Sequence, residues 1–333
     1  MDDKLEWYAA MAMREALGKD EQFDYQLLVN GVAGENELFR LLMEQNYQDV
    51  WWRRNFWLSR QVECDLLLVT HAKLYVLNAK YYNGQFVYRD NVAYFNGKPL
   101  QNDPLSSFQL SMGRLKKLLA EAGIEVPVEG RVVFMNPNFG CSFDESVSVE
   151  CVPRHGVLRM FQDIRDVAVQ VGRRNGLNPE RIGQQLLALE SDSKYNLPVV
   201  KDTHMQKMTC GLLCPACGAN EASSRGAAVQ RRTAAIVRSK LTIERQKVTC
   251  EVCDYQALKR SAVLLAVEEY CKLFHHKTSF TTMDICWFMG EEIRRRYVID
   301  TLSAHYTLIG GGPSSSYLNP HYRDPNNFEK FSK

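Results

Sequence analysis

The sequence ECDLLLVTHAKLYVLNAK, residues 63–80, decides the fold that we expect for the first half of this chain. It contains two apolar runs, separated by the turn signal His71-Ala72-Lys73. Two such runs on either side of a short turn predict a pair of neighbouring strands in a buried sheet. Polar residues interrupt the apolar pattern at Asp65, Asn78 and Lys80. Polar groups among buried strands are costly unless they are paired or bind a ligand, so these strands also carry the candidate chemistry.

Helical and strand patterns surround these two strands. An amphipathic helical segment covers about the first 25 residues, and a second helix begins at about Asn30. Short strands follow between turn signals at Asn83-Gly84 and Asn96-Gly97. A long helix runs from about Pro104 to Ala122, with Leu110 among its inward residues, and Arg131–Met135 forms another strand. Two more helices lie within residues 156–190. This order predicts an α/β fold with a mixed sheet flanked by helices.

Composition excludes several classes of protein. The 333 residues suffice for two or three domains, and 45% hydrophobic with 24% charged residues is typical of a globular protein. No apolar run is long enough to span a membrane. The acidic start Met1-Asp2-Asp3-Lys4 is not followed by an apolar core, so we expect no secretory signal and a cytoplasmic location. The chain has no glycine-rich nucleotide loop, G-x-S-x-G or H-E-x-x-H motif, which argues against NTPase, triad-hydrolase and zincin chemistry.

The net charge of +2 conceals two halves of opposite sign. Residues 1–200 carry a net charge of −4, and residues 201–333 carry +6. Within the second half, seven cations face only Glu244: Arg225, Arg231, Arg232, Arg238, Lys240, Arg245 and Lys247. Such clustering predicts contacts with a nucleic-acid backbone, although a solvated charged face is the commoner fate of a charge run.

Four of the ten cysteines form two C-x2-C pairs: Cys214, Cys217, Cys250 and Cys253. Two intervening residues allow both thiolates of a pair to reach one tetrahedral ion, and Gly218 supplies the backbone freedom that such a turn needs. We therefore predict a structural Zn²⁺ site rather than four buried thiols, with Cys210 as a spare or substitute ligand. The remaining five cysteines are expected in the core.

We expect four parts along the chain: a helical segment over residues 1–27, an α/β domain over 28–200, a zinc-ribbon-like module over 201–258 and a helical region over 259–333. In the last part, Thr281–Asp284 resembles a capping box, Gly290 ends a short helix, and another helix covers Glu291–Leu302. The pattern fits a helix-turn-helix with Arg294, Arg295 and Arg296 at phosphates. It equally fits a helical hairpin with a solvated arginine face.

The polar residues of the first half form a candidate site. Glu63 and Asp65 alternate on one strand, and Asn78 and Lys80 alternate on the next, so each pair is expected to share a face. Glu35, on the preceding helix, is placed to complete the group. The competing interpretation is that Asp65 and Lys80 form only a buried salt bridge.

At these residues the sequence resembles the nuclease-related domain (NERD) family, a branch of the PD-(D/E)XK nucleases. The resemblance is carried by Gly31-Val32-Ala33-Gly34-Glu35, by Asp65 and by Asn78-Ala79-Lys80, and it extends over roughly residues 28–140. It implies a restriction-endonuclease-like fold and divalent-metal-dependent hydrolysis of phosphodiesters. In that scheme Asp65 binds Mg²⁺ or Mn²⁺, Lys80 orients the attacking water, and Glu35 supports the metal through water.

Asn78 departs from this family, which has glutamate at that position. An amide oxygen can bind a metal ion but lacks the negative charge, and Glu63 is the candidate to supply the missing carboxylate. Two readings follow, a DNA nuclease and a nuclease-like protein that binds nucleic acid without cutting it. In a third, the zinc module contacts an acidic protein. The sequence does not determine the oligomeric state.

Overall fold

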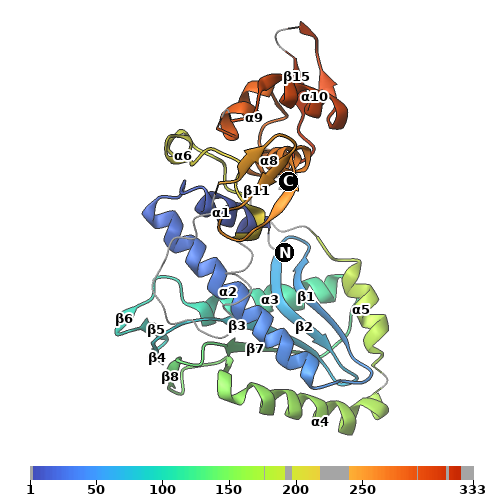
Figure 1. The fold of residues 1–333 in the computed structure, drawn as a ribbon. Helices are drawn as coiled ribbons and strands as arrows, with labels where there is room; N and C mark the ends of the chain where they lie inside the picture. Colours follow the sequence, from blue (N-terminus) through green and yellow to red (C-terminus); the bar gives the residue numbers. More distant parts are fainter. Residues whose placement is uncertain are drawn as a thin grey trace. The chain divides into compact units, whose positions relative to one another are not determined.

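The computed structural model describes residues 3–175, 177–191, 197–217, 240–290, 292–312 and 315–323. The chain forms two compact units (Figure 1). One unit spans Leu27–Tyr195, and the other combines Met1–Gln26 with Asn196–Lys333. Within the described ranges, no helix is both long and apolar enough to cross a membrane.

The unit over Leu27–Tyr195 is built on a mixed five-stranded sheet with strand order β1-β2-β3-β7-β9. Its strands are β1 (Trp51–Leu58), β2 (Val62–Val69), β3 (Leu74–Lys80), β7 (Val128–Phe134) and β9 (Glu150–Pro153). The pairs β1–β2 and β2–β3 are antiparallel, whereas β3–β7 and β7–β9 are parallel. A smaller sheet contains β4 (Gln85–Arg89), β5 (Val92–Phe95), β6 (Lys98–Pro99) and β8 (Gly140–Phe143). The predicted α/β class is confirmed.

Two hydrophobic clusters cover the two faces of the larger sheet. The first joins strand residues such as Val76 and Val132 to α3 (Pro104–Glu121) and α5 (Pro179–Leu187). The second joins Leu66, Leu77 and Val133 to α2 (Lys19–Glu44) and α4 (Val157–Asn175). Helices therefore flank the sheet on both sides, as expected from the sequence.

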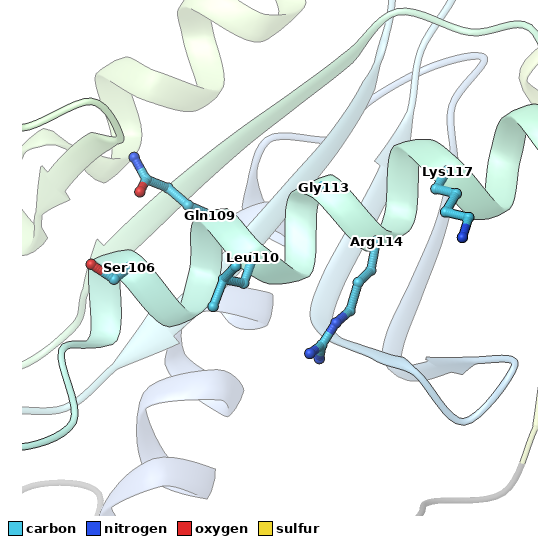
Figure 2. Close-up of a pocket in the computed structure, with 6 residues that line it drawn as sticks. All are labelled: Ser106, Gln109, Leu110, Gly113, Arg114 and Lys117. Carbon is cyan, nitrogen blue, oxygen red and sulfur yellow. The ribbon is translucent and has the colours of Figure 1, made fainter. Parts of the chain in front are cut away.

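Two expectations about helices are wrong. The second helix begins at Lys19 rather than near Asn30, so Gly31 and Gly34 lie inside α2. The side chain of Leu110 is 65% exposed, because α3 buries a stripe formed by Leu105, Phe108, Leu115, Leu118 and Leu119. Figure 2 shows Leu110 on the outer side of α3, in a shallow pocket that Ser106, Gln109, Gly113, Arg114 and Lys117 also line.

The other unit contains a small sheet, β10 (Thr242–Glu244), β11 (Lys247–Thr249) and β12 (Gln256–Leu258), and several helices. Its remaining elements are α1 (Asp3–Met13), α6 (Asp202–Lys207), α8 (Lys259–Leu273), β13 (Ser279–Phe280), α9 (Thr282–Phe288), α10 (Arg295–His305), β14 (Leu308–Ile309) and β15 (Ser316–Leu318). Thr281 and Asp284 form the expected capping box of α9. The last helix begins at Arg295, four residues after the predicted Glu291, which itself lies outside the described residues.

A buried arginine ties this unit together. Arg14 is fully buried, and its guanidinium pairs with Glu269 at 3.0 Å, donates to the Thr209 carbonyl and lies 3.6 Å from the centre of the Phe288 ring. Each of the three guanidinium nitrogens therefore donates to a partner, which offsets the cost of burying the charge. The end of α1 is thereby fixed to α8 and α9.

Substituting alanine for the two helical glycines Gly183 and Gly113 is expected to have opposite effects on stability. A Cβ at Gly183 in α5 would lie 2.4 Å from the Trp51 ring, whereas a Cβ at Gly113 in α3 would meet nothing within 4 Å. We expect Gly183→Ala to lower the free energy of unfolding by about 1–3 kcal/mol. Gly113→Ala should raise it by about 0.5–1 kcal/mol, through helix propensity alone. Urea unfolding of both variants measures this, and equal effects would contradict the packing of α5 on β1.

Candidate functional site

Asp65 lies where two neighbouring strands separate. The paired register of β2 and β3 runs from Val69↔Leu74 to Leu66↔Leu77 and stops there. Beyond that point, a carboxylate oxygen of Asp65 accepts a hydrogen bond from the backbone N–H of Ala79 at 2.7 Å. The side chain thus takes the role that a strand carbonyl has elsewhere in the ladder. Ala79 contributes through its backbone, and no side-chain pattern could have revealed this role.

The regular alternation of side chains along β2 also changes at Asp65. Val62 and Cys64 pack in the cluster with α3 and α5, whereas Leu66 and Leu68 pack in the cluster with α2 and α4. On the neighbouring strand, Asn55 adopts a φ of 46°, a left-handed conformation that asparagine tolerates better than most residues. The period-2 rule that placed Glu63 and Asp65 on one face therefore does not hold across this point.

Lys80 is an electrostatic neighbour of Asp65. Burial raises the pKa of Asp65, while the positive charge of Lys80 and the Ala79 N–H act in the opposite direction without outweighing it. On β3, Leu74 and Val76 face the cluster with α3, so the alternating positions Asn78 and Lys80 continue along that face. Both side chains are partly buried. The structure thus gathers a carboxylate, an amide and an ammonium group around the end of β3.

Glu35 comes from the opposite side of the sheet. Its helix, α2, packs with Leu66, Leu77 and Ala79 through Leu38, Leu41 and Leu42. At Gly34 the helix comes so close that a Cβ would lie 3.2 Å from Tyr81 and 3.5 Å from Met135, the residues just after β3 and β7. This close approach brings the backbone beside Glu35 to the carboxyl ends of both strands. Glycine at position 34 is the sequence signal for it.

The carboxylates are not gathered as tightly as the cysteines. Glu63 is exposed, whereas Glu35 and Asp65 are partly buried. Across the described ranges, only the four cysteines form a group of three or more acidic, histidine or cysteine residues with ligand atoms within 4.8 Å of one another. Glu35, Glu63 and Asp65 therefore do not form a three-carboxylate cage. Mg²⁺ does not require one, because it is commonly held by one or two carboxylates with water and substrate phosphate.

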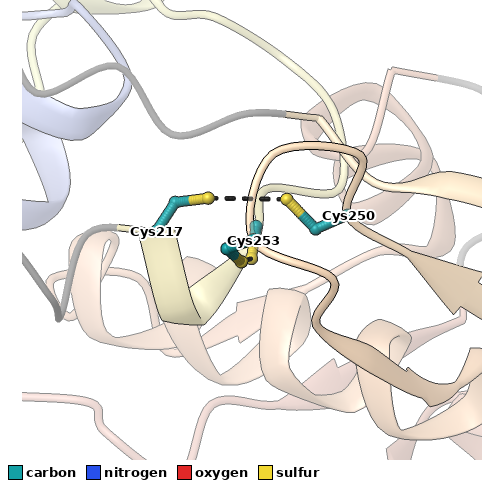
Figure 3. A group of neighbouring side chains, drawn as sticks. Cys217, Cys250 and Cys253 are labelled. Carbon is teal, nitrogen blue, oxygen red and sulfur yellow. Dashed lines mark hydrogen bonds between the residues drawn. The ribbon is translucent and has the colours of Figure 1, made fainter.

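The two C-x2-C pairs meet in the other unit. The sulfur of Cys217 lies 3.4 Å from that of Cys250 (Figure 3). The sulfur of Cys214 lies 3.6 Å from that of Cys253. A tetrahedron with Zn–S bonds of about 2.3 Å has edges of about 3.8 Å, so these separations suit zinc. Cys214 and Cys250 are buried, and Cys217 and Cys253 are partly buried.

The chemistry of these four thiols also fits a cation. The Tyr255 N–H lowers the pKa of Cys253, but burial and hydrogen bonds with the other three thiols outweigh it and raise that pKa to about 12. Four adjacent thiols resist ionisation together unless a metal ion compensates their charge. Cys210 stays outside the group, and its thiol donates to the Met208 carbonyl at 3.6 Å. Of the five cysteines expected in the core, Cys64, Cys271 and Cys286 are buried, and Cys141 and Cys151 are partly buried.

The basic segment is described only in part. Lys240, Arg245 and Lys247 are exposed, and the latter two lie at the turn between β10 and β11. Arg225, Arg231, Arg232 and Arg238 lie outside the described residues. Three exposed cations therefore lie on or just before the sheet that follows the first cysteine pair.

Comparison with known families agrees with the geometry of the first unit. The family model of the nuclease-related domain, NERD, matches residues 30–135. Residues 30–135 form a nuclease-related domain. The match includes α2 from Asn30 onward, β1 to β3 and β7, and thus every polar residue discussed above for the sheet site. The mixed sheet between helices is consistent with a nuclease-like fold. No curated protein and no solved structure matches the chain.

The cysteine geometry predicts about one zinc ion per chain. We expect Cys214→Ser and Cys250→Ser to lose this zinc, because removing a thiolate breaks the tetrahedral set. Cys210→Ser is the matched control and should retain it. Atomic absorption on purified protein measures the zinc content. A Cys214→Ser variant with undiminished zinc would contradict this assignment.

Proposed function

We propose that this chain is a divalent-metal-dependent DNA nuclease with a zinc-stabilised module that binds the DNA backbone. The observation that carries the proposal is the Asp65 carboxylate, held by the Ala79 N–H at the point where β2 leaves β3, with the charge of Lys80 near it, inside the nuclease-related domain. A carboxylate and an ammonium group at the end of the same two strands match the two needs of phosphodiester hydrolysis, a metal ligand and a cation for the phosphate.

Each side chain has a chemical task in this proposal. Asp65 and Asn78 would hold Mg²⁺ or Mn²⁺ through hard oxygen ligands, and the ion would polarise the phosphate and acidify a water molecule. Lys80 positions the attacking water and stabilises negative charge on the phosphate oxygens. The hydrogen bond from Ala79 fixes the orientation of the Asp65 carboxylate. Glu35 supports the ion through water, and Glu63 is the second candidate for the missing carboxylate.

The proposed zinc ion gives the small module its rigidity. Its sheet contains three strands of three residues each, which bury too little apolar surface to hold themselves together. Zinc bound by Cys214, Cys217, Cys250 and Cys253 would fix this sheet and present Lys240, Arg245 and Lys247 to phosphates. The cytoplasmic location and the four-part domain division expected from the sequence stay predictions.

One observation favours a second function. Asn78 contributes no charge, so the metal ion would rest on fewer carboxylates than the family pattern provides. Loss of metal affinity would leave a nuclease-like domain that binds nucleic acid without cutting it. Catalysis and binding are therefore tested separately.

Cleavage of duplex and single-stranded DNA with Mg²⁺ or Mn²⁺ tests the catalytic proposal. We expect Asp65→Ala and Lys80→Ala each to reduce the rate by at least about 100-fold. Asn78→Glu should lower the metal concentration at half-maximal rate, because it adds the missing charge. Arg159→Ala, an exposed substitution on α4, is the control and should leave the rate unchanged.

Glu63→Gln identifies the source of the second carboxylate. A higher metal requirement in Glu63→Gln, abolished by combining it with Asn78→Glu, would assign that role to Glu63. DNA binding without metal-dependent cutting in the wild-type protein would reject the nuclease and favour the binding protein.

The exposed hairpin between β10 and β11 predicts a salt effect. If Arg245 and Lys247 contact two phosphates, Arg245→Ala with Lys247→Ala should reduce the slope of log affinity against log salt by about 1.8. Fluorescence anisotropy with labelled DNA over a range of salt concentrations measures the slope. An unchanged slope would remove these two residues from the DNA contact.

A further inference from the structure

The C-terminal part of the second unit has the topology of a winged helix. Its elements follow the order α8, β13, α9, α10, β14, β15. The three short strands form one antiparallel sheet with the order β13-β15-β14, so the hairpin β14–β15 follows the second helix of the pair and closes onto β13. A helix-turn-helix followed by such a hairpin is the winged form of that motif. The motif was visible in the sequence only as two helices around a glycine.

A common aromatic core holds these elements together. The Tyr270 ring of α8 lies 5.4 Å from Phe288 at the end of α9 and 6.0 Å from Phe280 of β13. Phe280 in turn stacks on Tyr317 of β15 at 5.8 Å. From α10, Val298 and Leu302 are fully buried. The hairpin and the helix pair are thus one packed module rather than a helical hairpin with a loose tail (Figure 1).

The helix-turn-helix geometry leaves one side of α10 exposed. Met289 caps α9, and Gly290 then turns the chain with a φ of 74°. Arg294, Arg295 and Arg296 are exposed at the start of α10, whose first turn holds no acidic residue. Arg296 pairs with Asp300 at 3.1 Å, but both side chains are more than half exposed, so this pair contributes little. Ser303 and Ala304 continue the exposed side toward the end of the helix.

The hairpin lies beside this exposed side. The hydroxyl groups of Ser303 on α10 and Tyr317 on β15 are 3.2 Å apart. Between the two strands the chain passes through Gly310, Gly311 and Gly312, which have no side chain to prevent close approach to a partner. Leu308, Ile309 and Leu318 are 52%, 42% and 47% exposed on the hairpin. Helix and hairpin are therefore neighbours, each with exposed side chains, and the start of the helix is cationic.

We propose that residues 259–318 form a winged helix that inserts α10 into the major groove of duplex DNA. The choice of DNA rests on the proposed function. The major groove, about 12 Å wide, admits an α-helix of about 10–12 Å diameter. The positive end of the helix dipole and the three arginines face phosphates at the groove edge, while Ser303 and Ala304 follow the floor. The glycine hairpin lies over the neighbouring backbone.

The test uses the full-length Asp65→Ala protein, so that DNA stays intact, and a labelled duplex of mixed sequence. We expect Arg295→Ala with Arg296→Ala to weaken duplex binding at least about 10-fold and to reduce the salt slope by about 1.8. Arg159→Ala with Arg165→Ala is the matched control, because it removes two exposed arginines from α4 in the other unit. Duplex RNA is a second control, since its deep, narrow major groove does not admit a helix.

The outcomes separate this inference from the nuclease. Equal losses from the α10 and α4 pairs, or an equal loss on duplex RNA, would overturn groove insertion in favour of general charge attraction. If Ile309→Asp changes the oligomeric state and neither it nor the α10 substitutions change DNA affinity, the surface is a protein interface. That result would also overturn groove insertion. If the α10 substitutions weaken duplex binding and the wild-type protein does not cut DNA, the winged helix is supported and the nuclease is rejected. If DNA cutting requires Asp65 but DNA cutting and binding do not require Arg295 and Arg296, the nuclease is supported and the winged helix is rejected.

Discussion

The sheet site depends on one hydrogen bond, from the Ala79 N–H to the Asp65 carboxylate. By accepting this bond the side chain ends the β2–β3 ladder, and the two strands separate at the proposed site. Removing a carboxylate from water raises its pKa and costs free energy unless charge or hydrogen bonds compensate. Lys80 and the amide compensate only in part. The free energy to hold such a group in place comes from the two apolar clusters on either side of the sheet.

The small sheet of the second unit has little apolar surface to stabilise it. The strands β10, β11 and β12 are too short to form a stable sheet on their own. The four cysteine sulfurs lie close together, and a metal ion bound there would take the place of a hydrophobic core. The winged-helix part has enough aromatic residues to pack without metal. Both parts carry exposed cations: Lys240, Arg245 and Lys247 near the small sheet, and Arg294, Arg295 and Arg296 at the start of α10.

Periodicity and spacing predicted much of this architecture. The strands around residues 63–80, the helix from Pro104, the capping box at Thr281 and the cysteine pairs all follow local rules. The failures have tertiary causes. Helix α2 continues through Gly34, because packing on Tyr81 and Met135 outweighs the low helix propensity of glycine there. The alternation at Asp65 changes where its side chain binds the Ala79 amide, and strands as short as β13 and β14 leave no periodic signal.

Because Asn78 is uncharged, metal binding at the proposed site would depend on DNA contacts made elsewhere in the chain. In the proposed site Asp65 and Asn78 would hold the metal ion with little protein charge, and the substrate phosphate would add to that charge. Metal and DNA would then bind cooperatively, and by linkage each would increase the affinity of the other by the same factor. Contacts made by the basic half would thus raise the metal affinity of the acidic half without touching the ion. If the proposed metal site is weak, DNA contacts elsewhere in the chain would compensate for it, and the net positive charge of residues 201–333 would serve that purpose.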